Sequence, residues 1–180
     1  DDDTAGYTLS KTTASVTEGG STDSFTVVLD TKPSSDVVLA VSSADTDEAT
    51  VSAASLTFTT ANWSNPQTID VTGVDDDVDD GDQDTTITVA VDDDSSDDAY
   101  DDVADSTVTA TTVDDDTVGY TLSAAIASVT EGGSTDSFTV VLDTKPSSDV
   151  VLTVLSADTG EATVDLAQLT FTSSDWDTPQ

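Results

Sequence analysis

Apolar and polar positions alternate along much of the first 113 residues with the two-residue period of β-strands. In Ser24–Asp30 the side chains of Phe25, Val27 and Leu29 share one face, as in a strand that buries one side. Thr85–Val91 repeats the alternation. No window has the three-to-four-residue period of an amphipathic helix, so the pattern predicts an all-β fold.

Turn residues separate the strand-forming runs at the spacing typical of a β-sandwich. Gly19-Gly20 and Lys32-Pro33-Ser34-Ser35 are two such turns. About seven strands are predicted, the first of them broken. They cover Gly6–Ser10 with Ala14–Thr17, then Ser24–Asp30, Asp36–Ser42, Ala49–Ser52, Leu56–Thr59, Thr68–Val74, Thr85–Val91 and Thr107–Val113.

The chain contains an internal repeat with an offset of 113 residues. Residues 1–67 match residues 114–180 at 52 of 67 positions, and residues 15–41 differ from their copy only where Ala40 is replaced by Thr153. Units of this length that each bury a core are typical of tandem domains. We expect residues 1–3 to end a preceding repeat, residues 4–116 to form a complete repeat, and residues 117–180 to form an incomplete second one.

This organisation indicates a piece of a longer array. The second copy lacks the counterparts of residues 68–113, so we expect its core and a sheet edge to be exposed. Strand exchange with another copy of the chain is one way to cover that edge. A truncated sequence is the plainer interpretation.

The composition excludes most catalytic chemistry. The 180 residues include no Cys, His, Met or Arg, which removes thiol, imidazole and guanidinium groups. Ser and Thr are abundant, but no candidate base could activate them. The sequence therefore predicts a protein that is not an enzyme.

The net charge of −35 makes nucleic acid a poor partner and cations favourable ones. No apolar run is long enough to span a bilayer, so membrane insertion is not expected. Disordered acidic chains are usually poor in β-branched residues, whereas 34 Thr and 23 Val account for 57 positions here. A folded acidic β-protein is the better interpretation.

The acidic residues are clustered between the predicted strands. Of the 34 Asp, 18 lie within Asp75–Asp116. Two unit charges 4 Å apart repel by about 1 kcal/mol even in water, so runs such as Asp75-Asp76-Asp77 favour a bound cation. Ca²⁺ takes 6 to 8 oxygen ligands in irregular geometry, whereas Zn²⁺ prefers the absent His and Cys.

Three motifs resemble those of Calx-β domains. Ala14-Ser15-Val16-Thr17-Glu18-Gly19-Gly20 is similar to the family's opening motif, and Val74-Asp75-Asp76-Asp77-Val78-Asp79-Asp80 is similar to its central acidic loop. Asp114-Asp115-Asp116-Thr117-Val118-Gly119-Tyr120 is similar to its closing motif. The resemblance covers the whole 113-residue unit. It implies an immunoglobulin-like seven-stranded β-sandwich that binds calcium ions at one end.

The resemblance also implies the ligands. They would be Glu18, Asp45, Asp75, Asp76, Asp80, Asp114, Asp115 and Asp116, together with the Val78 carbonyl. Gln83 stands where the family has a second loop Glu, which leaves the number of ions open. Because the closing triplet leads into the next repeat without a Gly/Ser linker, bound ions would stiffen the connection to neighbouring repeats of the same chain.

These observations favour a calcium-binding structural repeat of a bacterial or archaeal adhesin-type protein, located outside the cell or on its surface and forming a stalk or fibre. A calcium-sensing or ligand-binding module is an alternative. Another alternative is a halophilic surface domain without specific metal sites, in which the acid only keeps the protein hydrated. The run Asp92–Asp105 is either a solvated loop or a further ion site.

An EF-hand is rejected as the source of a calcium site. The segment starting at Asp76 has Val78 at the third loop position and Ile87 at the twelfth, where a bidentate Glu is required. Trp63 and Trp176 occupy equivalent positions in the two copies, and we expect them to pack against the core rather than to stack on sugars.

Overall fold

The computed structural model describes residues 3–180 and is all-β apart from two short 3-10 helices. Asp1 and Asp2, predicted to end a preceding repeat, lie outside the described residues. The chain forms two compact units, one of residues 1–76 and 80–115, the other of residues 77–79 and 116–180.

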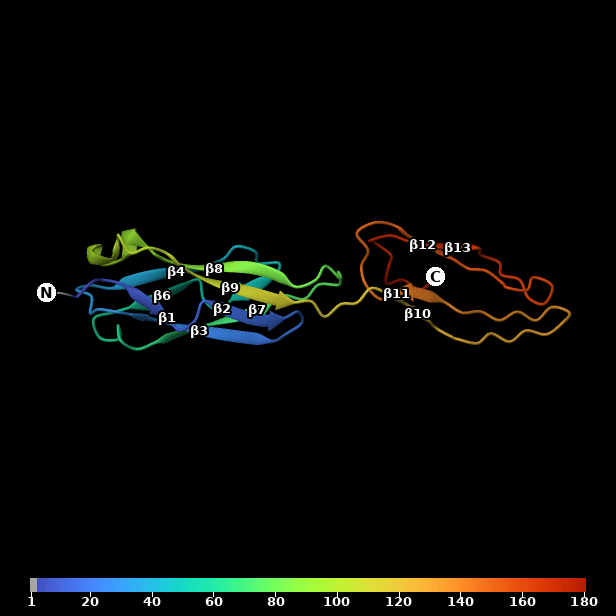
Figure 1. Ribbon diagram of the computed structural model, residues 1–180, viewed down its shortest axis with the longest axis horizontal. Coiled ribbons are helices and arrows are strands. Elements are labelled where there is room, and N and C mark those ends of the chain that lie inside the picture. The colour runs from blue at the N-terminus through green and yellow to red at the C-terminus, as the bar shows by residue number, and fades with distance from the viewer. Residues whose placement is uncertain (1–2) are drawn as a thin grey trace. The chain divides into compact units, whose positions relative to one another are not determined.

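The first unit is a sandwich of two sheets (Figure 1). The four-stranded sheet has the order β1-β3-β7-β5 and consists of β1 (Tyr7–Leu9), β3 (Thr22–Leu29), β7 (Gln67–Gly73) and β5 (Ala49–Val51). The five-stranded sheet has the order β2-β9-β8-β4-β6 and consists of β2 (Thr13–Thr17), β9 (Ser106–Val113), β8 (Gln83–Val91), β4 (Val37–Ser43) and β6 (Ser55–Phe58).

Every predicted strand region of this unit is a strand, but there are nine strands rather than about seven. The predicted broken first strand is two strands that belong to different sheets. β1 pairs antiparallel with β3, and β2 pairs parallel with β9. The all-β sandwich is confirmed, whereas the count of seven strands is not.

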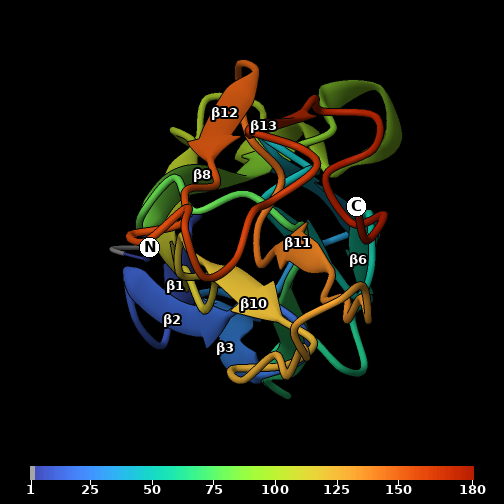
Figure 2. The same ribbon diagram turned by 90° about the vertical axis from the view of Figure 1, so that its right-hand side faces the viewer.

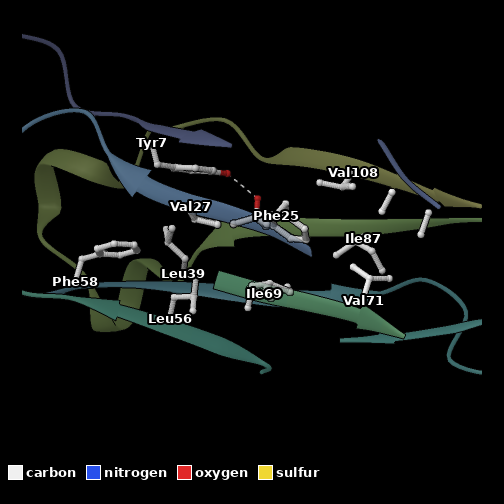
Figure 3. Packing of buried hydrophobic residues seen from close by; sticks show 14 of the residues in the cluster. Tyr7, Phe25, Val27, Leu39, Leu56, Phe58, Ile69, Val71, Ile87 and Val108 are labelled. Atoms are coloured by element: carbon white, nitrogen blue, oxygen red, sulfur yellow. Dashed lines mark hydrogen bonds between the residues drawn. The ribbon is translucent and has the colours of Figure 1, made fainter. Parts of the chain in front are cut away.

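The core lies between the two sheets, where the apolar faces of their strands meet (Figure 3). Phe25 and Ile69 from one sheet and Leu39 and Ile87 from the other are fully buried. The alternating burial along β3 and β8 follows the alternation of their sequences. Trp63 packs against this core from the side, as expected for a residue near a corner.

Tyr7 connects β1 to β8 and to the start of β9 through its hydroxyl group. Its hydroxyl donates a hydrogen bond to the Val89 carbonyl at 2.6 Å (Figure 3) and accepts one from the Ser106 N–H at 3.0 Å. A buried hydroxyl that finds both partners is satisfied, so Tyr7 fastens β1 to β8 and β9 across the core.

The segment between β8 and β9 contains η1 (Asp93–Ser95) and η2 (Asp98–Tyr100). Asp97 is buried between them and accepts hydrogen bonds from the Ser34 N–H and hydroxyl and from the Ser35 and Ala99 N–H groups. Its pKa is lowered to about 2, chiefly by the Ser34 hydroxyl. Asp97 thus holds the β3–β4 turn, a structural role inside the predicted acidic run.

The second unit has two separate two-stranded ladders (Figure 2). β10 (Tyr120–Leu122) pairs with β11 (Val140–Leu142), and β12 (Val150–Thr153) pairs with β13 (Gln168–Phe171). Its small core is formed by Val140, Leu142, Leu169 and Phe171, and Trp176 packs against it.

Apolar side chains are exposed in the second unit as the sequence predicts. Tyr120 is the counterpart of Tyr7, yet 57% of its surface is exposed against 8% for Tyr7. The residues that bind the Tyr7 hydroxyl lie in segments that have no counterpart within residues 117–180. No helix among the described residues is long and apolar enough to cross a membrane.

Candidate metal centre

The candidate site lies at one end of the first unit, where several strands begin or end. Glu18 directly follows β2, and Asp114 directly follows β9. β2 and β9 run parallel with Thr17 opposite Val113, and the Glu18 N–H donates to the Val113 carbonyl at 3.1 Å. The parallel pairing therefore places the opening and closing motifs side by side, although Glu18 and Asp114 are 96 positions apart in the sequence.

The acidic loop reaches the same end from β7. β3 pairs antiparallel with β7, so the end of β7 lies beside the start of β3, next to the Gly19-Gly20 turn. A Cβ added to Gly19 would lie 3.0 Å from Asp75 Oδ1 and 3.8 Å from Asp115 Oδ2. Gly19 also has a φ of +71°, which an L side chain rarely adopts. The glycine lets the loops of two different motifs approach this turn.

Glu18 is the most deeply buried carboxylate of the cluster, with 5% of its surface exposed. Its Oε2 atom is buried and has no hydrogen-bond partner. The pKa of Glu18 is raised to about 7, first by burial and then by the charges of Asp114 and Asp76, while a hydrogen bond from the Asp115 backbone acts in the opposite direction. Such a carboxylate is costly to keep charged without a cation.

Carboxylate oxygens of Glu18, Asp76 and Asp116 all lie within 4.8 Å of one another. Asp116 follows Asp115 directly along the chain and is half-buried. Oxygens at such separations fit the first coordination shell of an ion with metal–oxygen distances of 2.3 to 2.6 Å. These three predicted ligands are brought together as the sequence motifs imply.

Asp80 and Asp114 border the cluster. Both raise the pKa of Glu18 by repulsion. Asp114 Oδ2 accepts a hydrogen bond from the Gly81 N–H at 2.6 Å, which fixes the acidic loop against the closing motif. Asp82 Oδ1 accepts from the Asp114 N–H at 3.3 Å.

Asp45 and Val78 are the remaining predicted ligands. Asp45 closes the turn after β4, where its N–H donates to Thr85 Oγ1 at 3.0 Å and its carboxylate accepts from the Asp47 N–H. The charge of Asp45 helps to raise the pKa of Glu48. Val78 lines a hollow of the second unit together with Tyr120 and Leu142.

Glu48 is an acidic residue near the site that the motifs did not indicate. Burial raises its pKa first, followed by repulsion from Asp80 and Asp45. Its carbonyl accepts hydrogen bonds from the Val74 N–H and the Thr112 hydroxyl. The sequence did contain a signal, because the only four Glu residues occupy two equivalent pairs of positions in the repeat, 18 with 131 and 48 with 161.

The equivalent residues of the second unit are arranged differently. Glu131, the counterpart of Glu18, is exposed. The strand after which the acidic loop would follow has no counterpart within residues 117–180. The cluster of the first unit therefore depends on a complete set of strands.

No family model and no curated protein matches the sequence. Solved structures that resemble it include the apo-form Calx CBD1 domain, with a TM-score of 0.47 and 16% identity over 63% of this chain and 100% of that chain. CBD12 from CALX1.2 has a TM-score of 0.46 and 14% identity over 97% of this chain and 74% of that chain.

Domains 4 and 5 of the S-layer protein SbsC have a TM-score of 0.39 and 21% identity over 59% of this chain and 50% of that chain. None of these three structures reaches a TM-score of 0.5 or 25% identity. The neighbours therefore include Calx-β domains without assigning the chain to a family, and the fold class rests on the strands described above.

Proposed function

We propose that the chain is a non-catalytic calcium-binding structural repeat. The observation that carries this proposal is the buried Glu18 Oε2, which has no hydrogen-bond partner and faces a cluster of further carboxylates. A divalent cation there would satisfy the orphaned oxygen and turn the repulsion from Asp76 and Asp114 into joint ligation.

Calcium fits the donor set better than other common metals. The cluster offers carboxylate oxygens only, and the sequence has no His or Cys for Zn²⁺. Mg²⁺ requires near-ideal octahedral geometry and keeps several waters, whereas Ca²⁺ accepts irregular sites built from loops. Glu18, Asp76 and Asp116 would hold the ion, with Asp75, Asp80, Asp114 and Asp115 completing or surrounding its shell.

The proposed role of the ion is mechanical. It would join the turn after β2, the loop after β7 and the segment after β9, whose mutual repulsion otherwise favours separation. Because Asp116 leads to Gly119 through only two residues, an ion at this end restrains the start of the next repeat. A tandem array of such repeats would form a stiff stalk or fibre.

The proposed location is the outside or surface of a bacterial or archaeal cell, in an adhesin-type protein. Extracellular calcium at millimolar concentration fills even modest sites, with dissociation constants of about 10⁻⁴ to 10⁻³ M. Calcium ions in such an array would take the stabilising place that disulfides have in many secreted domains, and this chain has no Cys.

Thermal unfolding tests the proposal. With free calcium at 100 times its dissociation constant, one site stabilises the folded unit by about 2.7 kcal/mol, which raises the melting temperature by roughly 10 °C for a unit of this size. The scan is run with calcium, with magnesium at equal concentration and with chelator.

Glu18→Gln and Glu131→Gln form a matched pair of variants. The two residues are equivalent in the repeat, but Glu18 is buried in the cluster and Glu131 is exposed. Glu18→Gln is expected to weaken calcium binding at least tenfold and Glu131→Gln to leave the calcium-dependent shift unchanged. Equal melting temperatures with calcium and with chelator contradict the proposal and favour a salt-adapted domain without metal sites.

A further inference from the structure

The first unit has a hollow at the end of the sandwich opposite the acidic cluster. It lies beside the start of β1 and the turn between β3 and β4, and its walls include Asp3, Ala5, Lys32, Pro33, Ser34 and Tyr100. Lys32 is one of only three Lys in a chain of net charge −35, and it stands at the rim of this hollow.

The second unit has the equivalent hollow, and there it holds an acidic segment. Its walls include Val118, Lys145 and Pro146, which correspond to Ala5, Lys32 and Pro33 at the repeat offset. Residues 77–79 belong to this unit.

Two hydrogen bonds donated by backbone N–H groups and one apolar contact surface hold that segment. The Lys145 N–H donates to the Asp77 carbonyl at 2.7 Å, and the Val118 N–H donates to Asp79 Oδ2 at 2.8 Å. Val78 lines the hollow together with Tyr120 and Leu142.

The same donors exist in the first unit. Lys32 and Ala5 are the counterparts of Lys145 and Val118, and their N–H groups meet no acceptor among residues 3–180. Tyr7 and Leu29, the counterparts of Tyr120 and Leu142, are buried in the core of the first unit and do not line its hollow, whose walls include Asp97 and Tyr100 instead. What the two hollows share is the pair of backbone donors, because residues 31–34 and residues 144–147 have the same sequence.

We propose that the hollow of the first unit is a docking site for the segment Asp77-Val78-Asp79 carried by a second copy of the repeat. The ligand supplies a carbonyl to the Lys32 N–H and a carboxylate to the Ala5 N–H. Because the hollow is also lined by Asp3 and Asp97, the Lys32 ammonium offsets acid that is already present, and recognition rests on the two N–H donors. Each repeat of an array thus presents an acidic loop at one end and a receptor for it at the other.

The inference rests on the tandem role proposed above but not on calcium, because the contacts that it uses are hydrogen bonds. It assigns an orientation to the array, since a loop at one end and a hollow at the other allow only head-to-tail association.

Cysteine cross-linking tests the docking in a chain that lacks native Cys. A copy of residues 1–113 is placed directly ahead of Asp1, which keeps the repeat spacing. Asp77→Cys is introduced in the added copy and Lys32→Cys in the original chain. Residues whose backbones are hydrogen-bonded lie close enough for a disulfide, which requires Cα atoms about 4.4 to 6.8 Å apart.

Two reference cysteine pairs give the extent of cross-linking expected for a known contact and for random encounter. Asp77→Cys with Lys145→Cys in the 180-residue chain reproduces the contact of the second unit. Asp77→Cys in the added copy with Thr57→Cys, an exposed position on β6, reports random encounter. The Lys32 pair is expected to close to the same extent as the Lys145 pair and at least tenfold faster than the Thr57 pair.

Closure of the Lys32 pair no faster than that of the Thr57 pair overturns the docking, whether or not the Lys145 pair closes. The experiment is run with calcium and with chelator. Closure in both conditions, combined with a melting temperature that ignores calcium, would leave the docking standing while contradicting the calcium-binding function. Amide hydrogen exchange provides a second readout, in which the Ala5 and Lys32 N–H groups exchange at least tenfold more slowly in the extended chain than in the 180-residue chain.

Discussion

Two buried carboxylates of the first unit have opposite environments. Asp97 accepts four hydrogen bonds, and its pKa is lowered to about 2. Glu18 has an oxygen without a partner, and its pKa is raised to about 7. A carboxylate that is fully satisfied by the protein has a structural role, whereas one left unsatisfied beside further acids is poised to accept a cation.

The stability of the first unit is expected to depend on Asp97 in acid. Its pKa is about 2 in the folded state against 3.8 without these contacts, so its contribution is present above about pH 4 and is lost as the pH falls towards 2. Asp97→Ala is expected to cost roughly 2 kcal/mol at neutral pH by leaving the Ser34, Ser35 and Ala99 N–H groups without this acceptor.

Chemical denaturation of the wild-type chain and of Asp97→Ala at pH 7, 4 and 2 checks this expectation. The difference in unfolding free energy between the two should be large at pH 7 and 4 and small at pH 2. An equal difference at all three pH values would contradict it. Asp165→Ala, at an exposed position in the second unit, is the control.

At the level of single residues the sequence predicted part of the site. Glu18, Asp76 and Asp116 were predicted and lie together, because family-like motifs mark the turns that meet at this end. Glu48 was missed because no motif contains it. Whether Asp97 belonged to an ion site or to a loop was left open, since only the fold brings the β3–β4 turn to it.

The alternation of apolar and polar residues predicted where the strands lie in the sequence, but it did not predict which strands pair with one another. Each strand of the first unit overlaps a predicted one, because residues that alternate between buried and exposed faces of a strand also alternate between apolar and polar types in the sequence. The split of the first strand between two sheets was not predictable from local pattern, since β2 pairs with Thr109–Val113 far along the chain. That same long-range pairing builds the site by bringing Glu18 beside the closing motif.

Substitution of Tyr7 tests how much the hydrogen bonds between β1 and the other sheet contribute to the unfolding free energy. Tyr7→Phe removes a hydroxyl that donates to the Val89 carbonyl and accepts from the Ser106 N–H. We expect a loss of about 1 to 2 kcal/mol in unfolding free energy, because two buried backbone groups lose a partner.

The internal repeat provides the control for this variant. Tyr120→Phe alters the equivalent residue, which is 57% exposed and makes no such bond among the described residues. Urea unfolding monitored by circular dichroism should show a lowered midpoint for Tyr7→Phe and an unchanged one for Tyr120→Phe. Equal effects of the two substitutions on the midpoint would show that the hydrogen bonds of the Tyr7 hydroxyl do not stabilise the first unit.

In the molecule as a whole, most acidic residues lie in the loops and few lie in the strands of the sheets. The strands carry the apolar core and Thr-rich outer faces, while the loops hold most of the Asp. Residues 1–113 have a net charge of −24, so four calcium ions, an illustrative number for a site of this kind, would neutralise about 8 of these charges. Most of this charge therefore has to be balanced by solvent and dissolved ions, whether or not the cluster binds calcium.

The two copies of the repeat show how a complete set of strands changes the surroundings of equivalent residues. Glu18 and Glu131 have the same local sequence, but only Glu18 is buried among other carboxylates. Local sequence thus encodes the ligands, while the assembled strands determine whether the ligands meet. The predicted division into residues 1–3, 4–116 and 117–180 remains a prediction.

The central claim is that the carboxylates at the end of the first unit hold a calcium ion. Anomalous diffraction from crystals of the chain grown in calcium tests it most directly. We predict a calcium peak about 2.3 to 2.6 Å from carboxylate oxygens of Glu18 and Asp76. Density that is empty there at millimolar calcium, with Glu18 Oε2 still lacking a partner, would contradict the account.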